Sequence, residues 1–376
     1  MKRINMITKS FILLIMLPFL ASCGAGQEDE AGMLEITDAL MPEFAIGSLP
    51  PVVSRGEIEY VATPQNLAIS TLTGLYIPED SANRRPFALV FNNDTRALPQ
   101  NGISRAEVVY EVLAEGITTR LIAIFQDFEI NPEPIGPLRS TRNYFAHIAA
   151  NHDAIFVHHG GSPAGYSAIQ NLGLQSIDGM RFDGSTIWRD AERRRSSGLE
   201  HSSVTSFQNL LERSEQLGYH TQQSGENPYI FNFFDTPTNL SEFNRADTIH
   251  INFAGSNTTT FRFNPTTLRY YKYSHGRPHI DGANGEQVSV TNLLVQITDI
   301  SIIPGDVEGR RNVRLTGSGR GYLAGMGTYI PILWERDNLN SPTRWINMEG
   351  EPLLLNPGSS WVNIVSSSPV FENTAQ

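Results

Sequence analysis

The chain has 376 residues, a formal net charge of −11 and a single cysteine. Such an acidic chain is a poor partner for nucleic acid, because binding there depends on Lys and Arg that neutralise phosphates. A single cysteine excludes an intramolecular disulfide, and no sequence motif predicts a cofactor or a metal site. At about 100–200 residues per domain, the length predicts two domains.

The N-terminus carries the pattern of a secreted lipoprotein. Three positive residues precede the apolar stretch FILLIMLPFLAS (11–22), which is shorter than the roughly 20 residues that a membrane span needs. Residues 1–22 are therefore interpreted as a signal peptide. The sequence LASC (20–23) resembles the lipobox of bacterial lipoproteins, so Cys23 is the predicted lipidation site and membrane anchor. An ordinary signal peptide with an incidental cysteine is the alternative.

Composition divides the rest of the chain. Residues 23–64 are predicted to be a flexible tether, because GAGQEDEAG (24–32) is small and acidic and SLPP (48–51) ends in two prolines. An N-terminal domain is predicted over residues 65–225 and a C-terminal domain over residues 235–370.

The first half of the N-terminal domain predicts mainly strands. FALVFNN (87–93) is a short apolar run of the kind found in buried strands, and RALPQNGIS (96–104) is a loop. Ser104 and Glu107 match a helix capping box, yet the β-branched segment EVVYEVLA favours a strand. We expect a strand here, followed by a turn at Glu115 and a second strand.

Helices alternate with strands in the second half of this domain. STRNYFAHIAANH (140–152) predicts a helix, because Phe145, Ile148 and Ala149 form one apolar stripe. DAIFVHH (153–159) predicts a strand, and a further helix starts at Ser162. The charged segment 189–203 predicts an exposed loop.

The C-terminal domain predicts strands throughout. The segments 266–276, 286–297, 327–335 and 344–365 alternate or are β-branched and are separated by turn signals. The glycine-rich TGSGRG (316–321) predicts a hairpin turn, and Trp334, Trp345 and Trp361 are expected in the core. The predicted fold is therefore an α/β or α+β N-terminal domain with a second, smaller, mostly-β C-terminal domain.

Several of these segments resemble a known family. ALPQNGISRAEVVYEVLAEGITTRLIAIF, IGPLRSTRNYF and DAIFVHHGGSP resemble the N-terminal domain of YerB-type bacterial lipoproteins. YYKYSHGRPHIDGANGEQVSVTNLLVQ, GSGRGYLAGMGTYIPILWER and LLLNPGSSWVNIV resemble the C-terminal domain of that family. The resemblance implies a two-domain, membrane-anchored envelope protein of unknown activity. One departure is EGITTR, where the family pattern has a second glycine after the glutamate.

Ser162 follows two glycines and precedes a proline. A helix cap is the leading interpretation, because Ser accepts a bond from an unpartnered N–H and Pro suits the first helical position. An anion site built with Gly161 and the helix N-terminus is the second, and a nucleophile is the third. Adjacent His158 and His159 face opposite sides of a strand, so one of them at most joins this site.

Glu111, Glu115 and Arg120 form a second candidate group. The two carboxylates are an even number of residues apart on a predicted strand and are expected to share a face. Arg120 lies across the hairpin from Glu115, where a solvated ion pair is the simplest interpretation. The functional alternative is a carboxylate in a cleft, with Glu115 as general acid or base.

Arg139, Ser140 and Arg142 form the third group. Arginines at a helix start oppose the helix dipole, so a purely structural role is less natural than usual. They are expected either to neutralise Glu111 or Glu115 or to receive an acidic ligand, since Arg presents a fork suited to carboxylates and phosphates.

The sequence thus predicts a lipid-anchored protein on the extracytoplasmic face of the cell membrane. Our first hypothesis is that a polar cleft of the N-terminal domain binds a cell-wall glycan, a peptide or an envelope protein. The alternatives are a glycan-cleaving enzyme that uses Glu115 and a structural partner in an envelope complex. No cofactor and no nucleic-acid partner are expected.

Overall fold

The computed structural model describes residues 66–223 and 231–373, which belong to one compact unit. Within these residues every helix ends by residue 216, and the elements from residue 232 onward are strands. The predicted fold class, a mixed N-terminal domain followed by a mostly-β C-terminal domain, is therefore confirmed. The predicted signal peptide, Cys23 and the whole of the predicted tether lie outside the described residues. Among the described helices, none has the length and apolarity needed to cross a bilayer.

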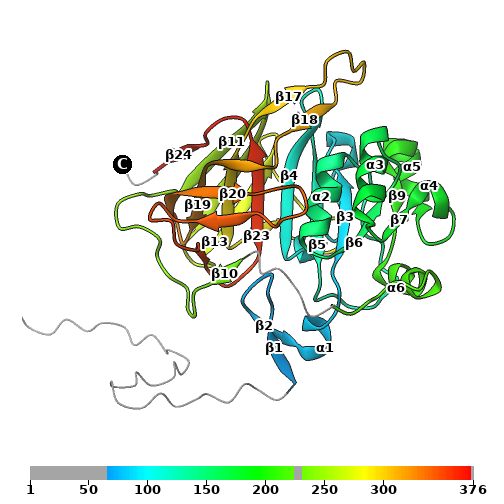
Figure 1. Cartoon of the computed structure of the whole chain (residues 1–376), viewed down its shortest axis with the longest axis horizontal. Helices are drawn as coiled ribbons and strands as arrows, with labels where there is room; N and C mark the ends of the chain where they lie inside the picture. Colours follow the sequence, from blue (N-terminus) through cyan, green and yellow to red (C-terminus); the bar gives the residue numbers. More distant parts are fainter. Residues whose placement is uncertain (1–65, 224–230, 374–376) are drawn as a thin grey trace, which may run out of the picture. The chain divides into compact units, whose positions relative to one another are not determined.

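A ten-stranded sheet runs through both domains (Figure 1). The N-terminal domain contributes the hairpin of β4 (Val108–Glu115) and β5 (Thr118–Phe125). Next to this hairpin lie β3 (Phe87–Asn92), β6 (Ile155–His158) and β7 (Ser176–Asp178). The predicted strand therefore replaces the capping-box helix at residues 107–114, because its apolar side chains alternate between two buried faces.

The C-terminal domain supplies the other half of the same sheet. Its strands are β16 (Asn292–Ile297), β19 (Gly317–Gly325), β20 (Thr328–Arg336), β21 (Arg344–Ile346) and β23 (Ser360–Val365). Strand β23 lies between β16 and β4 and pairs parallel with both. Backbone hydrogen bonds of one sheet thus join the two domains.

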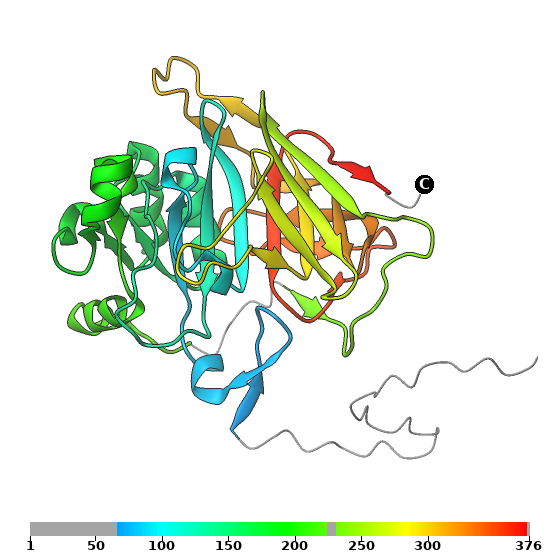
Figure 2. The ribbon, with the colours of Figure 1, turned by 180° about the vertical axis from the view of Figure 1, so that it is seen from behind.

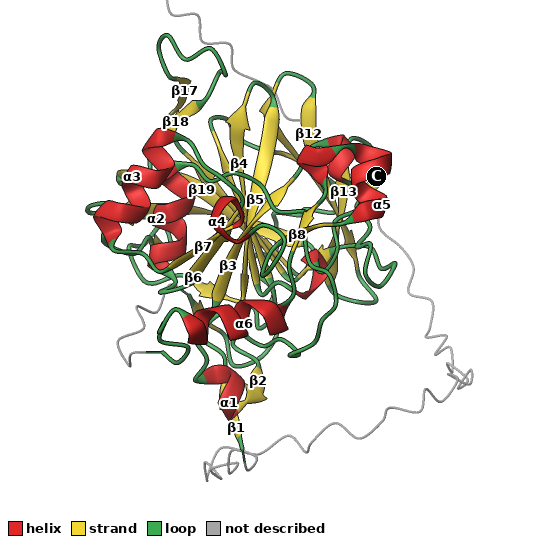
Figure 3. Cartoon of the chain, turned by 90° about the vertical axis from the view of Figure 1, so that its right-hand side faces the viewer, coloured by secondary structure: helices red, strands yellow, loops and turns green. Residues whose placement is uncertain are grey.

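The two faces of this sheet are covered by different elements. Helices α2 (Asn143–Asn151) and α3 (Pro163–Leu172) pack on one face (Figure 3). A second sheet, which contains β11 (Thr248–Ala254), β12 (Asn257–Asn264) and β13 (Arg269–Ser274), covers the opposite face (Figure 2). The hairpin of β4 and β5 is therefore buried on both sides, which explains its nearly continuous apolar sequence.

Shorter elements connect and flank these layers. The remaining helices are α1 (Glu79–Ala82), η1 (Thr95–Ala97), η2 (Ile103–Arg105), α4 (Gly179–Phe182), α5 (Ala191–Ser197), η3 (Leu199–His201) and α6 (Phe207–Gln216). The remaining strands are β1 (Leu67–Ile69), β2 (Tyr76–Pro78), β8 (Trp188–Arg189), β9 (Ser203–Val204), β10 (Asn232–Phe233), β14 (Arg277–Pro278), β15 (Ser289–Val290), β17 (Ile300–Ile302), β18 (Arg311–Val313), β22 (Leu354–Leu355) and β24 (Val370–Glu372).

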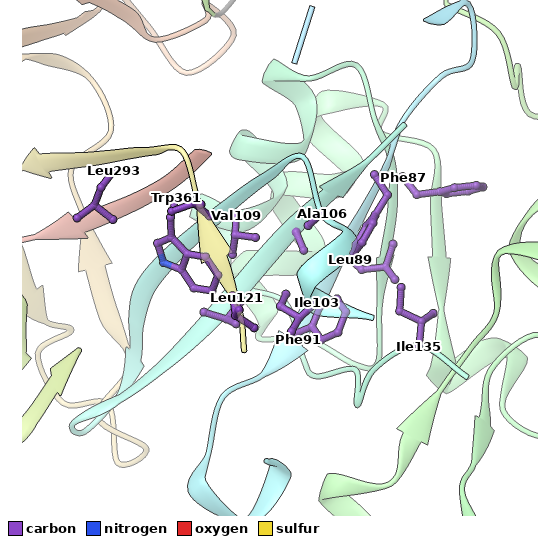
Figure 4. Packing of buried hydrophobic residues seen from close by; sticks show 14 of the residues in the cluster. Phe87, Leu89, Phe91, Ile103, Ala106, Val109, Leu121, Ile135, Leu293 and Trp361 are labelled. Atoms are coloured by element: carbon purple, nitrogen blue, oxygen red, sulfur yellow. The ribbon is translucent and has the colours of Figure 1, made fainter. Parts of the chain in front are cut away.

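The three tryptophans that were expected in the core do lie there. Trp334 and Trp361 are fully buried and Trp345 is 5% exposed. Figure 4 shows Trp361 beside Val109, its parallel partner on β4, and near Leu121 on β5. The core therefore extends without a break from one domain to the other.

Two local predictions are wrong. Segment 189–203, predicted as a loop, contains helix α5, which begins where the Asp190 carboxylate accepts a 2.8 Å bond from the Arg193 N–H. TGSGRG, predicted as a turn, lies largely within strand β19. The glycines suit that strand, because a Cβ at Gly319 would lie 2.5 Å from the Trp334 ring and one at Gly321 would lie 2.3 Å from a backbone oxygen.

Glu107, just before β4, makes stability depend on pH. Its buried carboxylate accepts bonds from the backbone N–H groups of Gln126 and Asp127, yet burial dominates and raises its pKa from 4.5 to about 7. Between these pH values the folded chain binds more protons than the unfolded chain, so this residue's contribution to stability falls as pH rises. In urea titrations of the wild type, we expect this residue to lower the free energy of unfolding by on the order of 1–3 kcal/mol between pH 5 and pH 7.5. Glu107→Gln should lack this pH-dependent loss. Parallel curves for the two proteins would contradict this.

Candidate functional site

The predicted site residues other than Glu111 lie at one edge of the large sheet. Strands β3, β4, β6, β7, β16 and β23 run in the same direction, so their carboxyl ends share that edge. Glu115 ends β4, His158 ends β6, and the segment 139–142 precedes α2 beside them. Ligands of open α/β sheets bind outside the carboxyl ends of the strands, so this edge is where a site is expected.

An ion cluster joins Glu115, Arg120 and Arg142. The Arg120 guanidinium lies 2.9–3.0 Å from both Glu115 carboxylate oxygens, so the predicted cross-hairpin pair forms. It is not the solvated pair that was expected, because the side chains are only 6% and 22% exposed. Arg142 forms an ion pair with the same carboxylate from the start of α2. Burial lowers the pKa of Arg120 to about 9, so it still carries its charge at neutral pH. Arg120 also donates to the Ser140 carbonyl, which ties the cluster to the segment before α2.

Glu111 lies on the other face of the sheet, contrary to the prediction that it shares a face with Glu115. A β-bulge between Leu113 and Glu115 shifts the register and reverses the alternation. Glu111 bonds Thr119, whereas Glu115 bonds Arg120, and these consecutive residues point to opposite faces of β5. Glu111 is 1% exposed and forms a 3.3 Å ion pair with Lys272 of β13, so it does not belong to the ion cluster of Glu115, Arg120 and Arg142.

A cleft of about 170 Å³ lies beside the ion cluster. Its charged and polar walls come from Arg139, Ser140, His159, Arg189 and Glu200. The Arg139 guanidinium lies 2.7 Å from the Glu200 carboxylate, whose side chain is 65% exposed. The Ser140 hydroxyl donates to the His159 carbonyl and so fixes the floor of the cleft. We call this hollow the arginine cleft.

His159 is an uncharged member of the arginine cleft. Arg189 donates to its Nε2 at 2.7 Å, and since Arg has no acceptor, the imidazole proton must lie on Nδ1. That Nδ1 donates to the Ser203 hydroxyl at 2.7 Å. Burial and the Arg189 charge lower the pKa of His159. The positive charge of the cleft is therefore carried by Arg139 and Arg189.

Ser162 is the N-cap of α3, as its leading interpretation predicts. Its hydroxyl accepts a 3.1 Å bond from the Gly165 N–H, and Pro163 occupies the first helical position. His158 is fully buried and bonds the Gly160 carbonyl at 2.8 Å. Gly161 pairs with Thr141, and a Cβ there would lie 2.8 Å from the Thr141 methyl group. None of these three predicted site residues lines the arginine cleft.

Ser162→Ala is expected to destabilise the protein by about 1 kcal/mol, because the first turn of α3 loses its acceptor. Urea unfolding monitored by circular dichroism measures this change. Ser167→Ala, on the exposed side of the same helix, is the matched control and should change stability little. Equal stability of Ser162→Ala and the wild type would show that the cap contributes nothing.

Sequence reasoning missed part of the arginine cleft. It did not select His159, Gly160, Arg189 or Glu200. Arg189 and Glu200 belong to the segment that was interpreted as a solvated loop. The many arginines and acidic residues of that segment were the available signal, but they did not show which residues elsewhere in the chain they contact.

Two family comparisons agree with this architecture. Residues 72–220 match the family described as "Protein of unknown function (DUF3048) N-terminal domain". Residues 249–362 match the family described as "Protein of unknown function (DUF3048) C-terminal domain". Together the matches cover most of the chain and correspond to the mixed and the mostly-β regions.

Two relatives extend the comparison to whole proteins. The chain is 34% identical over 298 residues to "Putative lipoprotein YerB" of Bacillus subtilis strain 168, which covers 78% of this chain and 85% of that protein. It also resembles the crystal structure of YerB protein from Bacillus subtilis, with a TM-score of 0.72 and 31% identity over 81% of this chain and all of that chain. The chain therefore belongs to the YerB-type family, whose two domains are both of unknown function.

Proposed function

We propose that this protein is a lipid-anchored envelope protein that binds an acidic component of the cell wall in its arginine cleft. Similarity to a protein named as a lipoprotein supports the anchor, with Cys23 as its site on the extracytoplasmic side of the membrane. The cleft holds the ligand while the anchor keeps the protein at the membrane surface.

The binding proposal rests on the acidic partners of the two cleft guanidiniums, which are exposed and easily replaced. Arg139 pairs with Glu200, and Arg189 lies 3.5 Å from Asp183, whose side chain is 44% exposed. Pairs with such exposed carboxylates contribute little stability. A ligand carboxylate or phosphate can take the place of Glu200 at little cost, and the planar guanidinium offers it two parallel bonds.

The size of the cleft restricts the ligand. A volume of about 170 Å³ is smaller than the roughly 300–1,000 Å³ of sites that enclose a drug-sized molecule. The cleft therefore suits the charged end of a longer chain, such as the terminal carboxylate of a wall peptide or an acidic group on a wall glycan. The rest of that polymer lies outside, which is the arrangement expected for a wall-binding protein.

The geometry favours binding over catalysis by Glu115. Both oxygens of that carboxylate are paired with guanidiniums, and Glu115 does not line the arginine cleft. A general acid or base must reach the proton that it transfers. The glycan-cleaving hypothesis keeps a direct test, since Glu115→Gln would abolish release of wall fragments without abolishing binding. A purely structural partner would tolerate changes in the cleft.

Arg139→Ala is expected to weaken binding to purified cell-wall sacculi about tenfold or more, because a charge-assisted bond contributes about 1.5–3 kcal/mol. The measurement is co-sedimentation of protein lacking residues 1–23 over a range of concentrations. Arg344→Ala, which removes an exposed guanidinium on β21, is the matched control and should bind normally. Equal sedimentation of both variants would contradict the proposal, and release of wall fragments would support the enzyme.

A further inference from the structure

A second cavity, of about 580 Å³, opens between the two domains. One wall is the loop of Leu98 and Pro99, and the other is the hairpin that follows β13, with Ser274, His279 and Ile280. The cavity is within the size range of small-molecule sites and combines apolar walls with few polar groups. None of the residues that line this cavity lines the arginine cleft, so the two hollows are separate.

Ser274 stands on the wall of this cavity with two strong partners. Its Oγ lies 2.9 Å from the Lys272 ammonium and 2.9 Å from His279 Nδ1. An ammonium only donates, so the serine oxygen accepts from Lys272 and its own proton is free for the imidazole. A hydroxyl oxygen has two lone pairs, and one remains after the bond from Lys272.

Gln100 fixes which imidazole nitrogen is the base. Its Nε2 donates to the Asn92 carbonyl at 2.9 Å and to Asn93 Oδ1 at 3.0 Å. Because the Asn92 partner is a backbone oxygen, the amide nitrogen must face it, and Gln100 Oε1 faces His279 Nε2. His279 therefore carries its proton on Nε2 and presents the lone pair of Nδ1 to Ser274.

Burial keeps the imidazole of His279 in its neutral form, with the lone pair of Nδ1 unprotonated. His279 is 2% exposed, and burial together with the Lys272 charge holds its pKa well below the usual value. The imidazole is thus neutral at pH 7. Lys272 is balanced by Glu111 at 3.3 Å, so its ammonium polarises Ser274 Oγ without leaving a net charge in the core. A nucleophile, a base and a group that orients the base are all in hydrogen-bond contact.

We propose that Ser274 is the nucleophile of an acyl-transfer site whose substrate is an ester with a small apolar acyl group. Ser274 Oγ bonds to the carbonyl carbon while its proton passes to His279 Nδ1. The carbon–oxygen ester bond then breaks, and the departing alcohol takes that proton. Water attacks the resulting acyl-serine, gives a proton to His279, and releases the acid as Ser274 regains the proton. Gln100 is a positioning residue in this scheme, and the site is independent of the arginine cleft.

The test is labelling of the full chain with a fluorophosphonate probe, followed by peptide mapping by mass spectrometry. The serine oxygen displaces fluoride from phosphorus, so the adduct marks an activated serine. We expect one adduct, on the peptide that contains Ser274, and none when the chain is unfolded in urea before labelling. No adduct at saturating probe, an adduct on another serine alone, or equal labelling of the unfolded chain would each overturn the proposal.

Variants separate activation from folding. His279→Gln should slow labelling about 100-fold or more, since general bases contribute about 10²–10⁴-fold. Ser318→Ala removes an exposed serine of β19 and should leave the labelling rate unchanged. Gln100→Leu should slow labelling, and Gln100→Glu, which restores an acceptor for His279 Nε2, should recover part of the rate. Labelling of Ser274 at the wild-type rate in folded His279→Gln would also overturn the proposal.

Discussion

Glu111→Gln is expected to lower the free energy of unfolding by about 3–5 kcal/mol. The change leaves the Lys272 ammonium, which is fully buried, without its counter-charge. The carboxylate also accepts bonds from Asn93 at 3.1 Å, Thr119 at 2.9 Å and the Trp361 ring N–H at 3.2 Å. An amide can serve some of these donors but cannot neutralise the ammonium. Urea unfolding followed by tryptophan fluorescence measures the loss.

A double variant distinguishes lost charge from lost shape. Adding Lys272→Met to Glu111→Gln removes the unpaired ammonium, so we expect part of the stability to return. Glu335→Gln is the surface control, because its pair with Arg344 is exposed and should contribute at most about 1 kcal/mol. A loss for Glu111→Gln no larger than that of Glu335→Gln would show that the buried pair does not stabilise the fold.

The N-terminal domain, residues 65–225, is expected not to fold when it is produced alone. Separation removes β23 from the edge of β4 and uncovers the face that β11–β13 protect. An exposed apolar edge strand promotes aggregation. We expect no cooperative thermal transition and a collapsed or aggregated species in size-exclusion chromatography.

Mixing provides the complementary measurement. Co-production of residues 65–225 with residues 231–376 should restore a soluble complex, because the missing strand can pair again. Trp361→Ala in the second fragment should prevent that recovery, since this side chain is fully buried against Val109 and Leu121. A sharp melting transition of residues 65–225 alone would contradict the expectation.

The sequence was most informative where one physical signal dominated. The apolar run of β3, the cap at Ser162 and the buried tryptophans all follow from local pattern. Local pattern failed at Gly319 and Gly321, where glycine makes room for Trp334 and a backbone oxygen of a neighbouring strand. A glycine in a turn and a glycine that makes room for a neighbouring group look the same in the sequence, so only the packed sheet distinguishes them.

The sequence predicted only part of the candidate site, because local pattern does not show which distant segments meet. Arg139 and Ser140 were selected because arginines at a helix start are unusual, and they do line the arginine cleft. The opposite wall comes from Arg189 and Glu200, which follow Arg139 by 50 and 61 residues, and the sequence does not show how close such distant segments lie in the fold. The separation of Glu111 from Glu115 depends on a single bulged residue, which alternation alone does not reveal.

The position of β23 in the large sheet has a consequence for the time at which the protein folds. Residues 360–365 lie between β4 and β16, so the sheet is incomplete until this late segment is available. Pairing of strands so distant in sequence is slow, because a long loop must close first. A chain that is synthesised from its N-terminus therefore cannot complete this sheet until residue 365 has been made.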